Sequence, residues 1–193
     1  IIGFQLNAPD TFAFATWVDI TEGTLVKFTD NAFLSNASAN QANNARGSEN
    51  FIIWKNNTGT TIPAGTVITI QDNTSAGITS LGTIVSGNLS GLSSSGDNIF
   101  AYQGPATSGA FPDFASVAAT TTFNGTVLFG LYTQGTSLLT SWQTTGVGTT
   151  TNSYLPSELS ASTSNIALAS NASRGQYTGL RNNQLTYSAY KAQ

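Results

Sequence analysis

The side chains that most often carry catalysis are missing from this sequence. Its 193 residues include no His, Cys or Met, and only six basic and nine acidic side chains. The chain therefore lacks the commonest general base, the strongest thiol nucleophile and every soft metal ligand. A Ser or Thr nucleophile would have to rely on a Lys or a carboxylate as its base, and the acidic residues occur mostly in turn sequences. We therefore expect no enzymatic activity.

Metal binding is the chemistry that the acidic residues leave open. Three Asp-Asn pairs begin at Asp30, Asp72 and Asp97, each beside an expected strand. Loops at one end of a β-sandwich can bring such hard oxygen ligands together around Ca²⁺. No Asp-x-Asp-x-Asp loop is present, and Asp-Asn is also a common turn sequence. The pattern favours turns, leaves a Ca²⁺ site as the alternative, and indicates no other cofactor.

Carbohydrate binding would require an exposed aromatic ring as a stacking platform. Trp17 and Trp54 lie in apolar stretches and are expected in the core. Trp142 lies between Ser141 and Gln143, in a polar setting. Trp142 is therefore the candidate ligand-binding residue.

Short stretches in which apolar and small or polar residues alternate run along the chain, separated by turns rich in Gly, Asn, Asp and Pro. This pattern predicts an all-β protein, a two-sheet β-sandwich of jelly-roll type, in a single domain spanning residues 1–193. The polar segment 35–50 is expected to be a long loop, either a binding or contact loop or a mobile one. At most one short helix is expected, at Leu185–Lys191.

The expected strands differ in how strongly the sequence marks them. The run 126–132 is continuously apolar, which predicts burial on both faces. The stretches 84–85, 166–168 and 176–178 are weaker. The other expected strands are residues 2–6, 12–18, 25–29, 51–54, 66–70 and 98–102.

Two segments share one pattern at a spacing of 42 residues. Residues 20–31 and 62–73 both begin with Ile, pass through a Gly-Thr turn into a single strand and end in Asp-Asn. Two copies are too few for a solenoid or a propeller. The repeat therefore predicts two equivalent turn–strand–turn units within one sandwich, with Gly23 and Gly65 supplying the positive φ that each turn needs.

Two motifs carry a resemblance to a known kind of domain. The run DTFAFATWVDI at residues 10–20, followed by GT at 23–24 and FTDN at 28–31, resembles one signature of a widespread module of bacterial secreted proteins. The run SGDNIFAYQG at residues 95–104 is similar to a second signature of that module. The module occurs in large extracellular proteins and in surface proteins with C-terminal sorting signals. The resemblance covers about residues 8–180 and implies a secreted all-β domain, with no catalytic residue to carry over.

The composition of the chain restricts the partners that it could bind and the compartment in which it is expected. The net charge of −3 and the scattered basic residues argue against nucleic acid as a partner. No stretch approaches the roughly 20 apolar residues that span a bilayer, so membrane insertion is not expected. Ser, Thr and Asn together number 69. Together with the absence of Cys, this composition favours a secreted protein, extracellular or on the cell surface.

The first residues carry a hypothesis about assembly. Residues 1–7 contain an apolar strand in which Ile1, Ile2, Phe4 and Leu6 are the apolar positions. Such a strand can either pair within its own sheet or add to the open sheet edge of a neighbouring copy. Repeated head to tail, the second arrangement builds an open polymer.

The sequence thus favours one function and leaves one alternative. The favoured function is a structural subunit of an extracellular filament, sheath or surface layer, joined to other copies of itself by β-strand addition. The alternative is a carbohydrate- or surface-binding adhesin module, with glycans as partners and an optional dependence on Ca²⁺.

Overall fold

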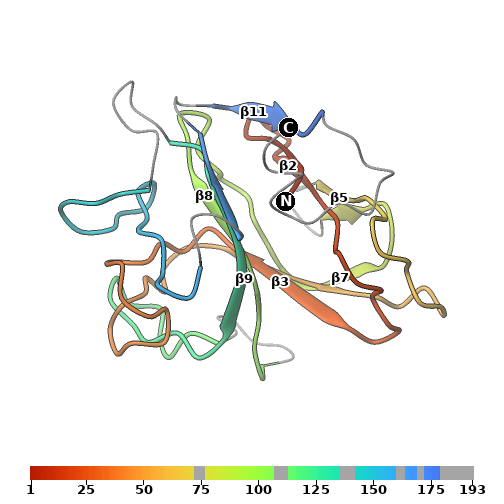
Figure 1. Ribbon diagram of the computed structural model, residues 1–193, viewed down its shortest axis with the longest axis horizontal. Helices are drawn as coiled ribbons and strands as arrows, with labels where there is room; N and C mark the ends of the chain where they lie inside the picture. The colour runs from red at the N-terminus through yellow and green to blue at the C-terminus, as the bar shows by residue number, and fades with distance from the viewer. Residues whose placement is uncertain (72–76, 107–112, 135–141, 160–163, 169–171, 179–193) are drawn as a thin grey trace.

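The structure is a computed structural model that describes residues 1–71, 77–106, 113–134, 142–159, 164–168 and 172–178. Within these residues the chain is all-β and contains no helix, and two sheets pack face to face (Figure 1). The predicted two-sheet sandwich is confirmed. The short helix predicted at Leu185–Lys191 lies outside the described residues.

One sheet has five strands in the order β11-β1-β2-β5-β6, and every neighbouring pair is antiparallel. The prediction of one strand over residues 12–18 is wrong at its end, because β2 stops at Phe14. The Thr16 hydroxyl then donates to the Val18 carbonyl at 2.7 Å, which closes a turn. The strands are β1 (Gly3–Gln5), β2 (Thr11–Phe14), β5 (Ile68–Gln71), β6 (Ile78–Thr79) and β11 (Arg174–Gln176).

The second sheet has six strands in the order β10-β9-β8-β3-β4-β7. Its neighbours are antiparallel except β9 and β10, which run parallel and so depart from a purely antiparallel jelly roll. The strands are β3 (Leu25–Thr29), β4 (Phe51–Lys55), β7 (Thr83–Asn88), β8 (Asn98–Gln103), β9 (Thr126–Tyr132) and β10 (Asn165–Ala167).

The main core lies between the two sheets. Phe14 on β2 contacts Phe28 on β3 and Trp54 on β4, with ring centroids 5.0 and 5.4 Å apart. Such tilted and edge-to-face pairs add to the free energy gained by burying the rings. The fully buried Trp54 confirms the prediction that this residue belongs to the core.

A second core covers the outer face of the six-stranded sheet. Along β8, Ile99 and Ala101 face the main core, whereas Phe100 and Tyr102 face the outer one. The outer core is closed by long connections that Figure 1 shows on the far side of β8 and β9 from β2 and β5. Its buried members are Phe33, Ala39, Ala45, Phe100, Tyr102, Phe114, Phe123, Val127, Tyr132, Trp142 and Leu159.

The polar segment 35–50 forms part of this cover. Ala39 and Ala45 are buried in the outer core. The Glu158 carboxylate accepts the N–H of Ala39 at 2.9 Å, which ties the segment to another connection. The segment therefore packs on the rest of the chain, and a role in binding stays a prediction.

The internal repeat has a structural counterpart. Ile20 and Ile62, which begin the two copies, pair with each other through two main-chain hydrogen bonds of 2.9 Å. From this bridge β3 enters one sheet and β5 enters the other. Gly23 and Gly65 both have positive φ, 84° and 79°, as the repeat predicted. The copies are equivalent turn–strand units on opposite sides of one sandwich.

The burial predicted for β9 holds for only half of the strand. Gly130, Leu131 and Tyr132 are buried, but the Leu128 side chain keeps 43% of its surface exposed. The exposed half of β9 borders an apolar groove between the two sheets.

Candidate functional site

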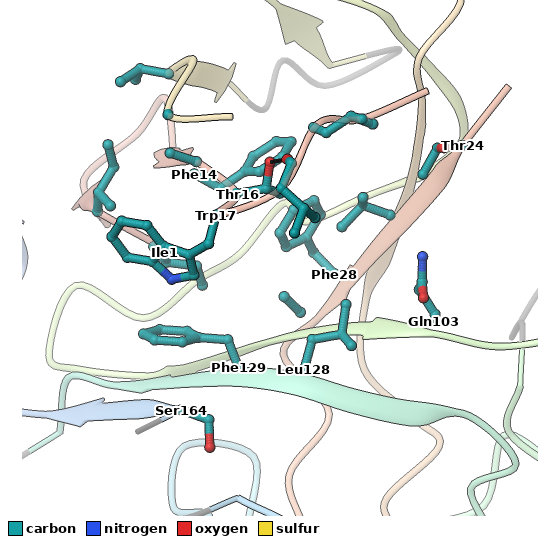
Figure 2. A pocket seen from close by; sticks show the side chains of 18 of the residues that line it. Ile1, Phe14, Thr16, Trp17, Thr24, Phe28, Gln103, Leu128, Phe129 and Ser164 are labelled. Atoms are coloured by element: carbon teal, nitrogen blue, oxygen red, sulfur yellow. Dashed lines mark hydrogen bonds between the residues drawn. The ribbon is translucent and has the colours of Figure 1, made fainter. Parts of the chain in front are cut away.

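An apolar groove of about 540 Å³ opens between the two sheets, where the residues before β1, the end of β2 and the segment that follows β2 face β3, β8, β9 and β10 (Figure 2). Among the described residues that line it, Asp19 is the one acidic or basic side chain. We call this feature the apolar groove. It is lined by Ile1, Ile2, Phe14, Ala15, Thr16, Trp17, Val18, Asp19, Ile20, Thr24, Val26, Phe28, Gly65, Val67, Ala101, Gln103, Leu128, Phe129, Ser164, Ile166 and Tyr177.

Large apolar side chains remain open to solvent around the apolar groove. Trp17 is 55% exposed, Val18 69%, Leu128 43% and Val67 37%. Figure 2 shows Trp17 on one side of the opening and Leu128 and Phe129 on the other. The prediction that Trp17 lies in the core is therefore wrong. Clustered exposed apolar side chains of this kind mark interaction sites on soluble proteins.

The predicted assembly residues lie at the same place. β1 lies between β11 and β2, with Phe4 opposite Phe12 on one side and Gly175 on the other. Leu6 is 2% exposed, and Phe4 packs against the main core. Ile1 and Ile2, which precede the strand, line the apolar groove. In the single chain the N-terminal strand thus pairs within its own sheet.

Trp142, the predicted carbohydrate platform, is not exposed. Its side chain is 6% exposed, and its ring stacks on Phe100 and Tyr132 with centroids 5.3 and 5.1 Å apart. The indole N–H donates to Asn165 Oδ1 at 2.8 Å. A buried Trp that has its polar atom satisfied and its ring stacked on two other rings is a core residue. The expectation that Trp142 offers an exposed stacking platform is therefore wrong.

Two of the three predicted metal ligands come together. Asp30 follows β3 and Asp97 precedes β8, and these strands are neighbours. The Asn98 side chain donates to the Asp30 carbonyl at 2.7 Å, which joins the two turns. Asp30 Oδ1 accepts the N–H of Asn50 at 2.6 Å, and Glu49 precedes that residue. Asp30, Glu49 and Asp97 form what we call the buried acidic cluster.

The pKa values of all three carboxyl groups in the buried acidic cluster are raised. The pKa of Asp30 is raised to about 8, mainly by burial and in smaller part by the nearby charge of Asp97. Burial likewise raises the pKa of Asp97 to about 7. The pKa of Glu49 rises to about 9 through burial and the charge of Asp30, against the opposing effect of Arg46. Removing carboxylates from water disfavours their charged form.

This protonation bears on the Ca²⁺ hypothesis, because calcium binds the ionised carboxylate. Within the described ranges, no three His, Cys, Asp or Glu side chains are arranged to hold a metal ion. Asp72, the third predicted ligand, lies outside the described residues. The Asp-Asn pair at 97 does act in a turn, since the Asp97 carboxylate accepts the N–H of Ser93 at 2.8 Å. A role for Ca²⁺ remains a proposal for experiment.

The apolar groove itself was missed by the sequence reasoning. The apolar run that ends in Trp17 and Val18 was assigned whole to one buried strand. A weak signal was present, since Thr16 interrupts the run and Asp19 follows it directly. Hydrophobic alternation alone does not tell where a strand leaves its sheet.

Comparisons of the chain with protein-family models, with curated proteins and with solved structures found no match. Within the residues described, no helix is long and apolar enough to cross a bilayer. The fold and the apolar groove therefore define the class of the protein, a two-sheet β-sandwich with an open apolar groove beside its N-terminal strand.

Proposed function

We propose that this protein is a non-enzymatic structural subunit of an extracellular polymer, in which neighbouring copies are joined by β-strand addition. One observation carries the proposal. The N-terminal strand is only three residues long, lies in the interior of its sheet and adjoins an apolar groove whose rim is exposed. The occupant that we propose for this part of the sheet is the N-terminal segment of a second copy.

Exchange of the strand costs few hydrogen bonds. In the single chain, the Ile2 N–H donates to Ala13 at 2.8 Å, and the Ile2 carbonyl accepts the Tyr177 N–H at 2.8 Å. A second copy that supplies residues 1–6 can make the same bonds to β2 and β11. Exchange of identical elements between copies is a low-cost route to assembly for this reason. Because the donor and the acceptor lie on different copies, the contact repeats into an open polymer.

The apolar groove supplies the favourable part of the free energy of assembly between copies. Closing a second copy over the groove removes the exposed surface of Trp17, Val18 and Leu128 from water. Asp19 is the one charged side chain among the described groove residues, so few ions lose their hydration on contact.

The resemblance of the two sequence motifs to a module of bacterial secreted proteins supports the extracellular part of the proposal. A chain with no Cys or Met, few Lys and abundant Ser, Thr and Asn suits a protein that persists outside the cell. Neither nucleic acid nor insertion into a membrane forms part of the proposed function.

A carbohydrate- or surface-binding adhesin is the second candidate. The exposed Trp17, rather than the buried Trp142, is the observation that favours it. Its indole is 55% exposed, and both Trp17 and Asp19 line the apolar groove. Together they provide a ring and a polar group of the kind that carbohydrate sites use. A glycan array with a Trp17→Ala variant tests this candidate directly.

Negative-stain electron microscopy of the concentrated full chain tests the proposed function. Ordered filaments or sheets are the expected result, and a uniform population of small particles at all concentrations would overturn the proposal. The same grids prepared after EDTA treatment test calcium separately. Polymers that dissolve in EDTA and return with Ca²⁺ would add a metal requirement, whereas unchanged polymers would remove Ca²⁺ from the proposal.

A further inference from the structure

A buried lysine and a buried aspartate meet in the outer core. Lys27 Nζ contacts Asp113 Oδ2, and the two side chains are 1% and 0% exposed. Lys27 lies in the middle of β3, at the centre of the six-stranded sheet. Asp113 lies 86 residues further along the chain, in a connection that covers the outer face. The pair therefore joins the sheet to its cover.

The surroundings of the pair exclude water. Lys27 Nζ lies 5.7 Å from the centroid of the Tyr102 ring. Tyr102, Phe114 and Phe123 contact one another in the outer core, with centroid separations between 5.1 and 6.3 Å. An ion pair in such a place has lost the hydration of both charges, which its mutual attraction repays only in part. Conversion to a neutral group would remove that cost.

Four features describe how the two side chains are held in position for a reaction. Lys27 Nζ donates to the Gly104 carbonyl at 2.9 Å, and Asp113 Oδ1 accepts the N–H of Ala106 at 3.0 Å. A Cβ at position 104 would overlap the Asp113 carboxyl carbon, so only Gly lets the carboxyl group approach. Asp113 itself has a positive φ of 71°, which a non-Gly residue rarely adopts.

We propose that Lys27 and Asp113 condense into an intramolecular isopeptide bond. A proton passes from the ammonium to the carboxylate within the pair, and the Nζ lone pair attacks the Asp113 carboxyl carbon. The Ala106 N–H stabilises the charge that develops on Oδ1, as an oxyanion hole does. The Nζ–Cγ bond forms, the Cγ–Oδ2 bond breaks, and Oδ2 leaves as water with two of the three ammonium protons.

The product retains the hydrogen bonds of the starting pair. Its one remaining N–H donates to the Gly104 carbonyl, and its carbonyl oxygen accepts the Ala106 N–H. Every polar atom of the buried amide is thus satisfied without water. The bond would close a long loop in a chain that has no cysteine and hence no disulfide, and such links restrict the unfolded state.

Intact mass spectrometry of the full chain, unfolded in acid, tests the proposal. The expected mass is lower than the mass of the sequence by one water molecule. Trypsin applied to the unfolded chain is expected to leave the bond after Lys27 uncut, while it cuts after Lys55 as usual. A full mass together with free cleavage after Lys27 would overturn the proposal.

Two controls tie a mass loss to folding and to this pair. Chain that has been kept in denaturant since its synthesis is expected to show the full mass and to lose water only after refolding. The Lys27→Arg variant retains a cation beside Asp113 but has no amine that can form the bond, so it is expected to show the full mass of its own sequence. Loss of water from Lys27→Arg would place the condensation elsewhere and would overturn the assignment.

Discussion

Phe4 lies directly across from Gly175, and the lack of a side chain at Gly175 leaves room for the Phe4 ring. The two are register partners in β1 and β11, and a Cβ at position 175 would lie 2.6 Å from Phe4 Cε1. β11 is therefore shaped for a neighbouring strand that carries an aromatic ring at this position. The same shape serves whether the strand comes from the same chain or from a second copy.

A methyl group at position 175 tests this relationship. We expect Gly175→Ala to push the Phe4 ring aside and to lower the free energy of unfolding by about 1–3 kcal/mol, as overpacking does. Urea denaturation followed by tryptophan fluorescence measures the change. Gly3→Ala is the matched control on β1, because a Cβ there would meet its neighbours at ordinary distances of 3.6 and 3.8 Å. Equal losses for both variants would contradict the expected role of Phe4.

Assembly is expected to depend on the inward face of β1 and not on its outward face. Phe4→Asp places a charge where the strand packs against the main core, and polymers should be absent by electron microscopy and sedimentation. Gln5 is exposed on the same strand, so Gln5→Asp adds the same charge and should leave polymers intact. The Phe4→Asp monomer is expected to fold with reduced stability, which circular dichroism checks. Polymers of normal yield from Phe4→Asp would rule out this strand as the contact.

Trp17 reports on the apolar groove during assembly. It is 55% exposed in the single chain, whereas Trp54 and Trp142 are 0% and 6% exposed. Covering the groove should therefore shift the tryptophan emission to shorter wavelength as polymers form. The Trp17→Phe variant should polymerise without that shift, since the other two indoles are already buried. An unchanged emission of the parent chain during polymerisation would place the contact elsewhere.

Trp142 is expected to matter for stability and not for ligand binding. Removing the ring that stacks on Phe100 and Tyr132 leaves a cavity, so Trp142→Ala should lower the free energy of unfolding by about 3–5 kcal/mol. Trp17→Ala, at an exposed site, should change it by about 0.5 kcal/mol or less in the monomer. Chemical denaturation of both variants gives the comparison. The reverse order would mean that Trp142 is not a core residue in solution.

The buried acidic cluster predicts that the protein is more stable in acid than at mildly alkaline pH. The pKa of Asp30 is about 8 in the folded state against a model value of 3.8, so the folded state binds more protons than the unfolded state between these values. The free energy of unfolding should therefore fall as pH rises through this window, by about 1.4 kcal/mol per pH unit for each such proton. Glu49 and Asp97 act in the same direction.

Denaturation curves at several pH values between 4 and 9 measure this slope. Asp30→Asn removes one of the titrating groups and should flatten the slope by about one proton. Gln5→Ala, at an exposed position without a titrating side chain, is the control and should leave the slope as it is. A free energy of unfolding that rises with pH would show that the carboxylates of the cluster are ionised and paired in the folded state.

Much of the fold follows from the sequence because it depends on local chemistry. The alternation of apolar and polar residues placed most of the strands, and the paired Gly-Thr turns at 23 and 65 marked the two repeated units. The sequence pattern does not predict β6, because this strand has only two residues and is stabilised by its pairing with β5. A strand that short has no periodicity to detect.

Strand alternation and residue type are properties of the chain alone, so they are enough to predict an all-β protein with few catalytic side chains. Which side chains are covered depends on how the strands and connections pack in the folded chain. Trp142 is buried against Phe100 and Tyr132 of the six-stranded sheet, Trp17 is open beside the apolar groove, and Lys27 meets Asp113 across 86 residues. The physical reason is that alternation shows that a strand has two faces, whereas the segment that packs on each face is set by contacts distant in sequence.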